Sequence, residues 1–195
     1  MEPQTRKPTG VRRREIAQAV LRVIGDHGAP ALTTARIANE VGVTSGALFR
    51  HFESIETMLD AAVDRAIEAV DETFPAAELP AVVRLRDMAQ ARIELIGGNR
   101  GLAWLLLSDQ VYLTASERSV TRLRALVTRS RRYLLGALRE GAANGTIRTD
   151  IAPEKLLMIF TGTVHAAIGS VGVHRVPEAG PDVLDALFTL ISPTP

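Results

Sequence analysis

The chain has 195 residues, of which 46% are hydrophobic and 23% are charged, a balance that predicts an ordinary globular protein with a full core. It contains no cysteine, which excludes disulfide and thiolate chemistry, and its four histidines lack metal-ligand spacing, so we expect no metal and no cofactor. The longest apolar run, residues 102–107, is too short to span a bilayer, and the N-terminus has no apolar signal segment. We therefore expect a cytoplasmic protein with no membrane partner.

The net charge of +1 conceals an asymmetry along the chain. Residues 1–52 carry eight basic and four acidic side chains, a balance of +4, which leaves −3 for the remainder. A basic N-terminal quarter indicates that this end meets a polyanion such as DNA. A solvated, disordered tail would account for part of the same imbalance.

Glycine and proline divide the chain into helical lengths, and no segment shows the alternation of a half-buried strand. The predicted fold class is all-α. Helices are expected at residues 12–26, 34–41, 44–52, 55–73, 80–96, 102–113, 117–143, 153–171 and 181–191.

Two short predicted helices, separated by a turn at Gly42 and Val43, follow a supporting helix and match a helix-turn-helix. The second helix of that motif enters the major groove, and its first turn here is slim enough to approach base edges closely. The same small residues would also suit tight helix packing. The candidate DNA contacts are Thr34, Arg36, Thr44, Ser45, Gly46, Ala47, Phe49, Arg50 and His51.

The stretch "TTARIANEVGVTSGALFRHFESIETML" closely resembles the DNA-binding head of the TetR (tetracycline-repressor) family of bacterial transcriptional regulators. The resemblance implies phosphate contacts at Thr34, Phe49 and His51, and base or groove contacts at Ser45, Gly46, Ala47 and Arg50. Phe49 stands where many relatives have tyrosine, and Ile55 stands where relatives commonly carry a lysine or arginine. We expect the basic residues 12–14 to compensate for these lost phosphate contacts.

The resemblance also implies a homodimeric repressor that binds palindromic double-stranded operator DNA and is released by a small-molecule effector. The sequence itself predicts a flexible basic arm at residues 1–10 and a helix-turn-helix DNA-binding domain at 11–54, followed by a helical domain at 55–195. The resemblance implies that this last domain binds the effector and forms the dimer. The sequence does not identify the effector, the operator or the regulated genes.

Two segments near the C-terminus are candidates for the dimer interface. The 181–191 helix carries a broad apolar stripe, and small residues line one face of the 153–171 helix. The alternative is that these faces pack within one subunit. The candidates are Gly162, Ala166, Gly169, Val183, Leu184, Leu187, Phe188 and Ile191.

Apolar and amphipathic side chains in the middle helices are candidates for lining an effector pocket. Methionines and aromatic residues at helical spacing are also typical of plain core, and a lone histidine in an apolar helix is commonly a core residue. The candidates are Met88, Trp104, Tyr112, Met158, Phe160 and His165.

An enzyme is not expected, because the sequence has no nucleophile elbow, P-loop, dinucleotide fingerprint or paired-carboxylate motif. A second alternative is a helical ligand-binding or protein-binding module with a degenerate DNA-binding head. The salt dependence of DNA affinity distinguishes the two, because a head that grips phosphates shows a steep fall of affinity with salt.

Overall fold

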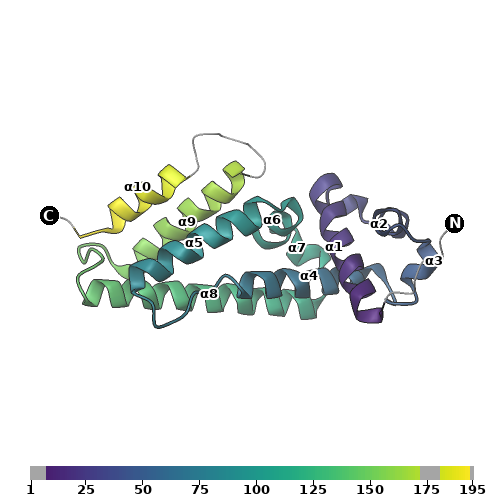
Figure 1. The fold of residues 1–195 in the computed structure, drawn as a ribbon, viewed down its shortest axis with the longest axis horizontal. Coiled ribbons are helices and arrows are strands. Elements are labelled where there is room, and N and C mark those ends of the chain that lie inside the picture. The colour runs from purple at the N-terminus through teal and green to yellow at the C-terminus, as the bar shows by residue number, and fades with distance from the viewer. Residues whose placement is uncertain (1–7, 172–180, 194–195) are drawn as a thin grey trace. The chain divides into compact units, whose positions relative to one another are not determined.

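The computed structural model describes residues 8–171 and 181–193, and these ranges form helices and no strand, which confirms the all-α prediction (Figure 1). Residues 1–7 of the predicted arm lie outside the described residues. The helices are α1 (Thr9–His27), the 3-10 turn η1 (Ala29–Ala31), α2 (Thr34–Val41), α3 (Ser45–Leu48), α4 (Ile55–Asp71), α5 (Ala81–Gly97), α6 (Arg100–Leu107), α7 (Val111–Thr114), α8 (Glu117–Ala143), α9 (Pro153–Gly169) and α10 (Pro181–Ile191).

The chain forms two compact units. Unit 1 comprises the described residues of Met1–Ala66 and Arg100–Thr121, and unit 2 those of Ile67–Asn99 and Arg122–Pro195. Helices α4 and α8 each contribute residues to both units. Unit 1 includes α6 and α7 as well as the segment expected to bind DNA. The predicted domains, in contrast, were continuous stretches of sequence divided between residues 54 and 55.

Local capping explains where the first short helices begin and end. The Thr33 hydroxyl accepts a hydrogen bond from the Arg36 backbone N–H at 3.3 Å and starts α2. Gly42 ends α2 with φ +72°, a left-handed conformation that glycine adopts without strain. The Thr44 hydroxyl accepts from the Ala47 N–H at 3.3 Å and starts α3. The turn between the two helices is therefore encoded locally.

Two predicted helices differ in the structure. The expected helix at 102–113 is divided into α6 and α7, because the Ser108 hydroxyl accepts from the Gln110 N–H at 3.2 Å and closes a turn between them. The expected helix at 44–52 is regular only over Ser45–Leu48 and continues as turns to His51. The segment expected to read DNA is therefore a single helical turn with an irregular extension.

The core of unit 1 joins α1 to α2 and α6, and α2 to α3. Ile16 and Val20 of α1, Ile37 of α2 and Leu48 of α3 are fully buried. On another side, α1 packs closely against α6, where a Cβ built on Gly101 would lie 2.1 Å from the Leu21 carbonyl oxygen. This close approach is possible only because Gly101 has no side chain.

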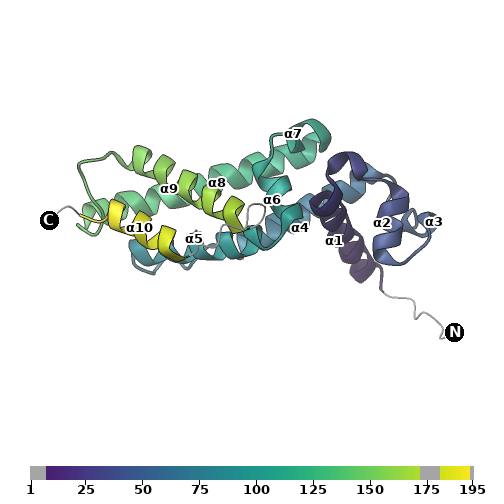
Figure 2. The same cartoon turned by 90° about the horizontal axis from the view of Figure 1, so that it is seen from above.

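In unit 2, α5, α9 and α10 pack side by side, as Figure 2 also shows. The rings of Phe160 on α9 and Phe188 on α10 meet edge to face with centroids 6.3 Å apart. The backbone N–H of Arg148 donates to the Ile191 carbonyl at 3.0 Å, and its Nη1 donates to the Leu190 carbonyl at 2.9 Å. These bonds satisfy carbonyls at the end of α10, which would otherwise lack partners.

Across residues 8–171 and 181–193, no helix has the length and apolar character needed to cross a bilayer. The same residues contain no cluster of three or more histidine or carboxylate side chains that could hold a metal ion.

Candidate nucleic-acid interface

The first turn of α3 is exposed on unit 1 and carries almost no side-chain bulk. Thr44, Ser45 and Gly46 are exposed, Ala47 is half-buried, and Leu48 points into the core with no exposed surface. One buried leucine therefore anchors α3, while its small residues face outward. A surface of this kind allows the helix backbone to approach base edges and phosphates closely.

A clamp from α1 holds the irregular extension of α3. Arg13 Nη1 donates a hydrogen bond to the His51 carbonyl oxygen, and the Arg13 guanidinium lies 4.1 Å from the centroid of the Phe52 ring. The carbonyls at a helix end lack intrahelical partners, so a charged donor there stabilises the end. Residues 12–14 were expected to compensate for lost phosphate contacts, which stays a prediction; in the structure the Arg13 side chain contacts the α3 segment.

Intramolecular contacts reduce the basic charge that unit 1 can offer to DNA. Arg12 forms an ion pair with Glu15 at 2.9 Å, and Arg22 forms one with Glu40. By contrast, Arg14, Arg36 and Arg50 are exposed and form no ion pair within the described parts of the chain. These three cations come from α1, α2 and the turn after α3, and are available for phosphates or guanine.

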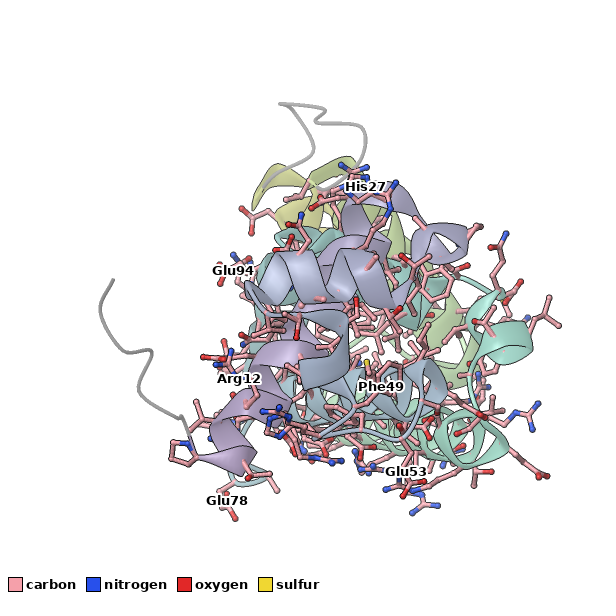
Figure 3. The ribbon with its side chains drawn as sticks, turned by 90° about the vertical axis from the view of Figure 1, so that its right-hand side faces the viewer. Arg12, His27, Phe49, Glu53, Glu78 and Glu94 are labelled. Carbon is pink, nitrogen blue, oxygen red and sulfur yellow. The ribbon has the colours of Figure 1, made fainter. Side chains whose placement is uncertain are left out.

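Phe49 and His51 border a hollow on unit 1 that is also lined by Arg13, Arg50 and Thr57. The Phe49 side chain is 50% exposed, and Figure 3 shows it on the side facing the viewer, with Glu53 near it. His51 is half-buried, and no described residue is hydrogen-bonded to its Nδ1. Since Nδ1 is buried, any phosphate contact from this ring would have to come from Nε2.

The first turn of α4, which follows the helix-turn-helix, contains no basic residue. The Thr57 backbone N–H donates to the Ser54 hydroxyl at 3.1 Å, and the Ser54 N–H donates to the Thr57 hydroxyl at 3.1 Å. This reciprocal pair is a capping box built from two hydroxyl side chains. Ile55 is half-buried beside it, so the exposed Glu56 is the charged residue in the first turn of α4.

The Gly46→Ala variant tests whether DNA approaches the backbone at this position, without destabilising the fold. A Cβ on Gly46 would meet no atom within 4 Å, and Gly46 has no positive φ. Alanine should therefore keep or raise the free energy of unfolding by about 0.5 kcal/mol. If the backbone approaches DNA at this position, the added methyl should weaken DNA affinity by roughly tenfold or more. Urea unfolding and fluorescence anisotropy with duplex DNA measure the two effects.

Gly136→Ala is the matched control for that experiment. Gly136 is an exposed residue of α8 in unit 2, and a Cβ there would also meet nothing within 4 Å. We expect a similar stability and unchanged DNA affinity. Equal affinities for both variants would show that DNA does not approach the Gly46 backbone.

The six candidate pocket residues are divided between the units. Trp104 and Tyr112 belong to unit 1, and the other four belong to unit 2. Within unit 2, Met88 and Phe160 are buried in the core, whereas Met158 is 76% exposed and His165 is exposed. The structure therefore does not gather these residues around one described cavity.

The candidate dimer residues of α9 and of α10 differ in their exposure to solvent. Gly162 and Ala166 are exposed on α9, next to Met158 and the 44% exposed Ile159. Gly169 and Val183 are half-buried. The α10 stripe faces inward, against its own subunit, and is not open to a partner: its buried members are Leu184, Leu187, Phe188 and Ile191.

Sequence reasoning named Arg13 only among the basic residues 12–14 and missed its contact with the α3 segment, and it also missed a link formed by Asp60. Asp60 Oδ1 accepts hydrogen bonds from the Ser116 and Ser119 hydroxyls, both at 2.6 Å, within unit 1. The partners of Arg13 and Asp60 are 38 to 59 residues away along the chain, so helical periodicity carries no signal for either contact.

Known proteins share both the motif and the whole fold. A sequence model described as "Bacterial regulatory proteins, tetR family" matches residues 16–62. The transcriptional repressor KstR2 of Rhodococcus jostii is 27% identical over 176 residues, covering 86% of each chain. The nucleoid occlusion factor SlmA of Vibrio vulnificus is 32% identical over 138 residues, covering 66% of this chain and 67% of that protein. The crystal structure of AibR in complex with isovaleryl coenzyme A and operator DNA superposes with a TM-score of 0.74 at 18% identity, covering 93% of this chain and 98% of AibR.

The helical fold and the exposed α2–α3 motif define a helix-turn-helix protein of the DNA-binding class. The chain belongs to the TetR family of bacterial regulatory proteins and is a transcriptional regulator of that family.

Proposed function

We propose that the protein is a homodimeric repressor that binds a palindromic operator through α2 and α3 and is released by a small molecule bound in unit 2. The observation that carries DNA binding is the exposed, small-residue turn of α3 beside the exposed cations Arg36 and Arg50. In this proposal Ser45, Ala47 and Arg50 read bases, while Thr34 and Arg36 hold phosphates and set the register.

The dimer is proposed to form through the exposed face of α9. Met158, Ile159, Gly162 and Ala166 present apolar or small groups to solvent on this helix. A Cβ on Gly162 would meet nothing within 4 Å, so another helix can approach closely at this position. Two heads in one dimer could then read half-sites about 34 to 36 Å apart, one turn of DNA.

Release by a ligand is proposed to act through α4, which contributes residues to both units. Asp60 on α4 accepts hydrogen bonds from the Ser116 and Ser119 hydroxyls at the start of α8. A movement of α4 would therefore also displace these residues of unit 1. A ligand that favours the conformation with wrongly spaced heads must weaken DNA binding by the same coupling factor. The AibR complex supports a small organic effector by showing one in a protein of the same fold.

We also propose that the protein is not an enzyme and works in the cytoplasm, associated with the nucleoid when bound to DNA. Two candidate nucleophiles already have structural partners: Ser130 accepts from Arg92 at 2.9 Å, and Ser170 donates to the Ala167 carbonyl at 2.8 Å.

Two observations favour the alternative of a degenerate DNA-binding head: position 55 is an isoleucine and not a cation, and the Arg13 side chain is bonded to the His51 carbonyl.

Selection from random DNA duplexes tests DNA binding. The wild type should enrich a palindromic site, and Arg50→Ala should cost about 1 to 3 kcal/mol at one base position. Arg131→Ala is the matched control, because Arg131 is an exposed arginine of α8 in unit 2. The log of affinity should fall linearly and steeply with the log of salt concentration. No enriched sequence at moderate salt would favour the degenerate-head alternative.

A further inference from the structure

Arg92 is a half-buried cation of unit 2. Its side chain extends from α5, where Nε donates to the Thr73 hydroxyl at 3.3 Å and Nη2 donates to the Ser130 hydroxyl at 2.9 Å. Thr73 and Ser130 are themselves buried, and the Arg92 guanidinium lies 5.1 Å from the centroid of the Phe74 ring. Arg92 therefore contacts two neutral hydroxyls and an aromatic ring.

The neighbouring arginines have carboxylate partners, whereas Arg92 does not. Arg129 forms an ion pair with Asp71, and Arg84, which is 6% exposed, forms one with Glu140. No carboxylate of the described residues lies within ion-pair distance of Arg92. The group formed by these three arginines and their two acids thus keeps one uncompensated positive charge.

Partial burial of this charge is unfavourable. Desolvation lowers the pKa of Arg92 to about 10; Asp71 opposes this shift, and the neighbouring charge of Arg129 adds to it. A neutral amide side chain could bond the same two hydroxyls without placing a charge in the interior. Proteins pair or coordinate charges that are withdrawn from water, so a partly desolvated guanidinium without an acid is suited to bind an anion.

The donors of Arg92 are also incompletely used. A guanidinium has five N–H groups in a fixed fork, and none of the described residues accepts a hydrogen bond from Arg92 Nη1. Its positive charge also acts on α9: the pKa of the exposed residue His165 is lowered first by partial desolvation of its ring and then by the charge of Arg92. Donors and positive potential are both available for a group that unit 2 itself does not supply.

We infer that Arg92, with the Ser130 hydroxyl beside it, is the anion-binding residue of unit 2, and that the effector carries a carboxylate or phosphate that pairs with Arg92. Both anions match the fork geometry of a guanidinium through two parallel N–H donors. This inference rests on the proposed effector site, and it assigns the chemical class of ligand that the site takes.

The test is a titration of the full-length protein followed by the ¹⁵N NMR signal of the Arg92 Nε–Hε group. The probes are inorganic phosphate and sodium acetate, at ionic strength held constant with sodium chloride. The signal is assigned by its absence in Arg92→Met. The ion-paired Arg148, bonded to Asp150 at 2.6 Å, serves as an internal control in the same spectrum.

A saturable shift of the Arg92 signal, with no saturable shift at Arg148, is the expected result. Saturation by phosphate alone assigns a phosphate-bearing ligand, and saturation by acetate alone assigns a carboxylic acid. The anion should also raise the melting temperature of the wild type and of Arg86→Met, a variant on the same helix whose arginine already pairs with Asp185 at 2.7 Å. Arg92→Met should lose this rise.

Absence of a saturable shift with both anions would overturn the inference and leave Arg92 as a structural tie between Thr73 and Ser130. The readout is independent of DNA. Failure of operator binding with a saturable Arg92 shift would therefore reject the proposed repressor function but not the anion site, and the reverse outcome would reject only the anion site.

Discussion

Gly101→Ala is expected to lower the free energy of unfolding by about 3 kcal/mol or more, because the new methyl group has no space at the crossing of α1 and α6. A Cβ on Gly101 would lie 2.1 Å from the Leu21 carbonyl oxygen and 2.6 Å from its carbonyl carbon. These are backbone atoms, so relief requires a shift of α1 itself. Since α1 supports α2 and supplies the Arg13 clamp, DNA affinity should fall together with stability.

Urea unfolding followed by circular dichroism measures this effect. Gly136→Ala again provides the control, because it makes the same change in a helix where the methyl meets nothing, and it should keep or raise stability. A Gly101→Ala protein within about 1 kcal/mol of the wild type would show that α1 and α6 can separate without loss of packing.

Ala166→Glu is expected to convert the dimer into monomers and to abolish measurable operator binding. Each copy would place a carboxylate in an apolar seam between two α9 helices, and a two-fold interface would contain that charge twice. The dimer dissociation constant should rise by roughly 100-fold or more. Ala166 is exposed in the single chain, so the monomer should fold normally.

Analytical ultracentrifugation over a range of protein concentrations measures the dissociation constant, and anisotropy with operator DNA measures the functional loss. Ala125→Glu is the matched control, because Ala125 is an exposed alanine on α8. It should remain dimeric. A dimer that persists in Ala166→Glu at wild-type strength would place the interface away from this face of α9.

Outward and inward faces of the C-terminal helices could not be distinguished from the sequence. The α10 pattern and the small residues of α9 both suit a helix seam, and both were candidates for the dimer interface. In the structure, Leu187 and Phe188 are buried in their own subunit, whereas Gly162 and Ala166 are exposed. A hydrophobic stripe predicts that a face is covered, but it does not predict by which chain.

The sequence by itself determined the all-α class and the α2–α3 motif, because helical periodicity, threonine caps and a glycine with positive φ act over a few residues. The family followed from the resemblance of residues 33–59 to the TetR DNA-binding head, and a family model matches residues 16–62. Tertiary structure decided which arginines of α1 are engaged, because Arg13 bonds to the turn after α3 and Arg22 forms an ion pair with Glu40 of α2. It also decided the close approach at Gly101 and the uncompensated charge of Arg92. Such contacts join residues far apart in the chain, and only packing in three dimensions brings them within reach.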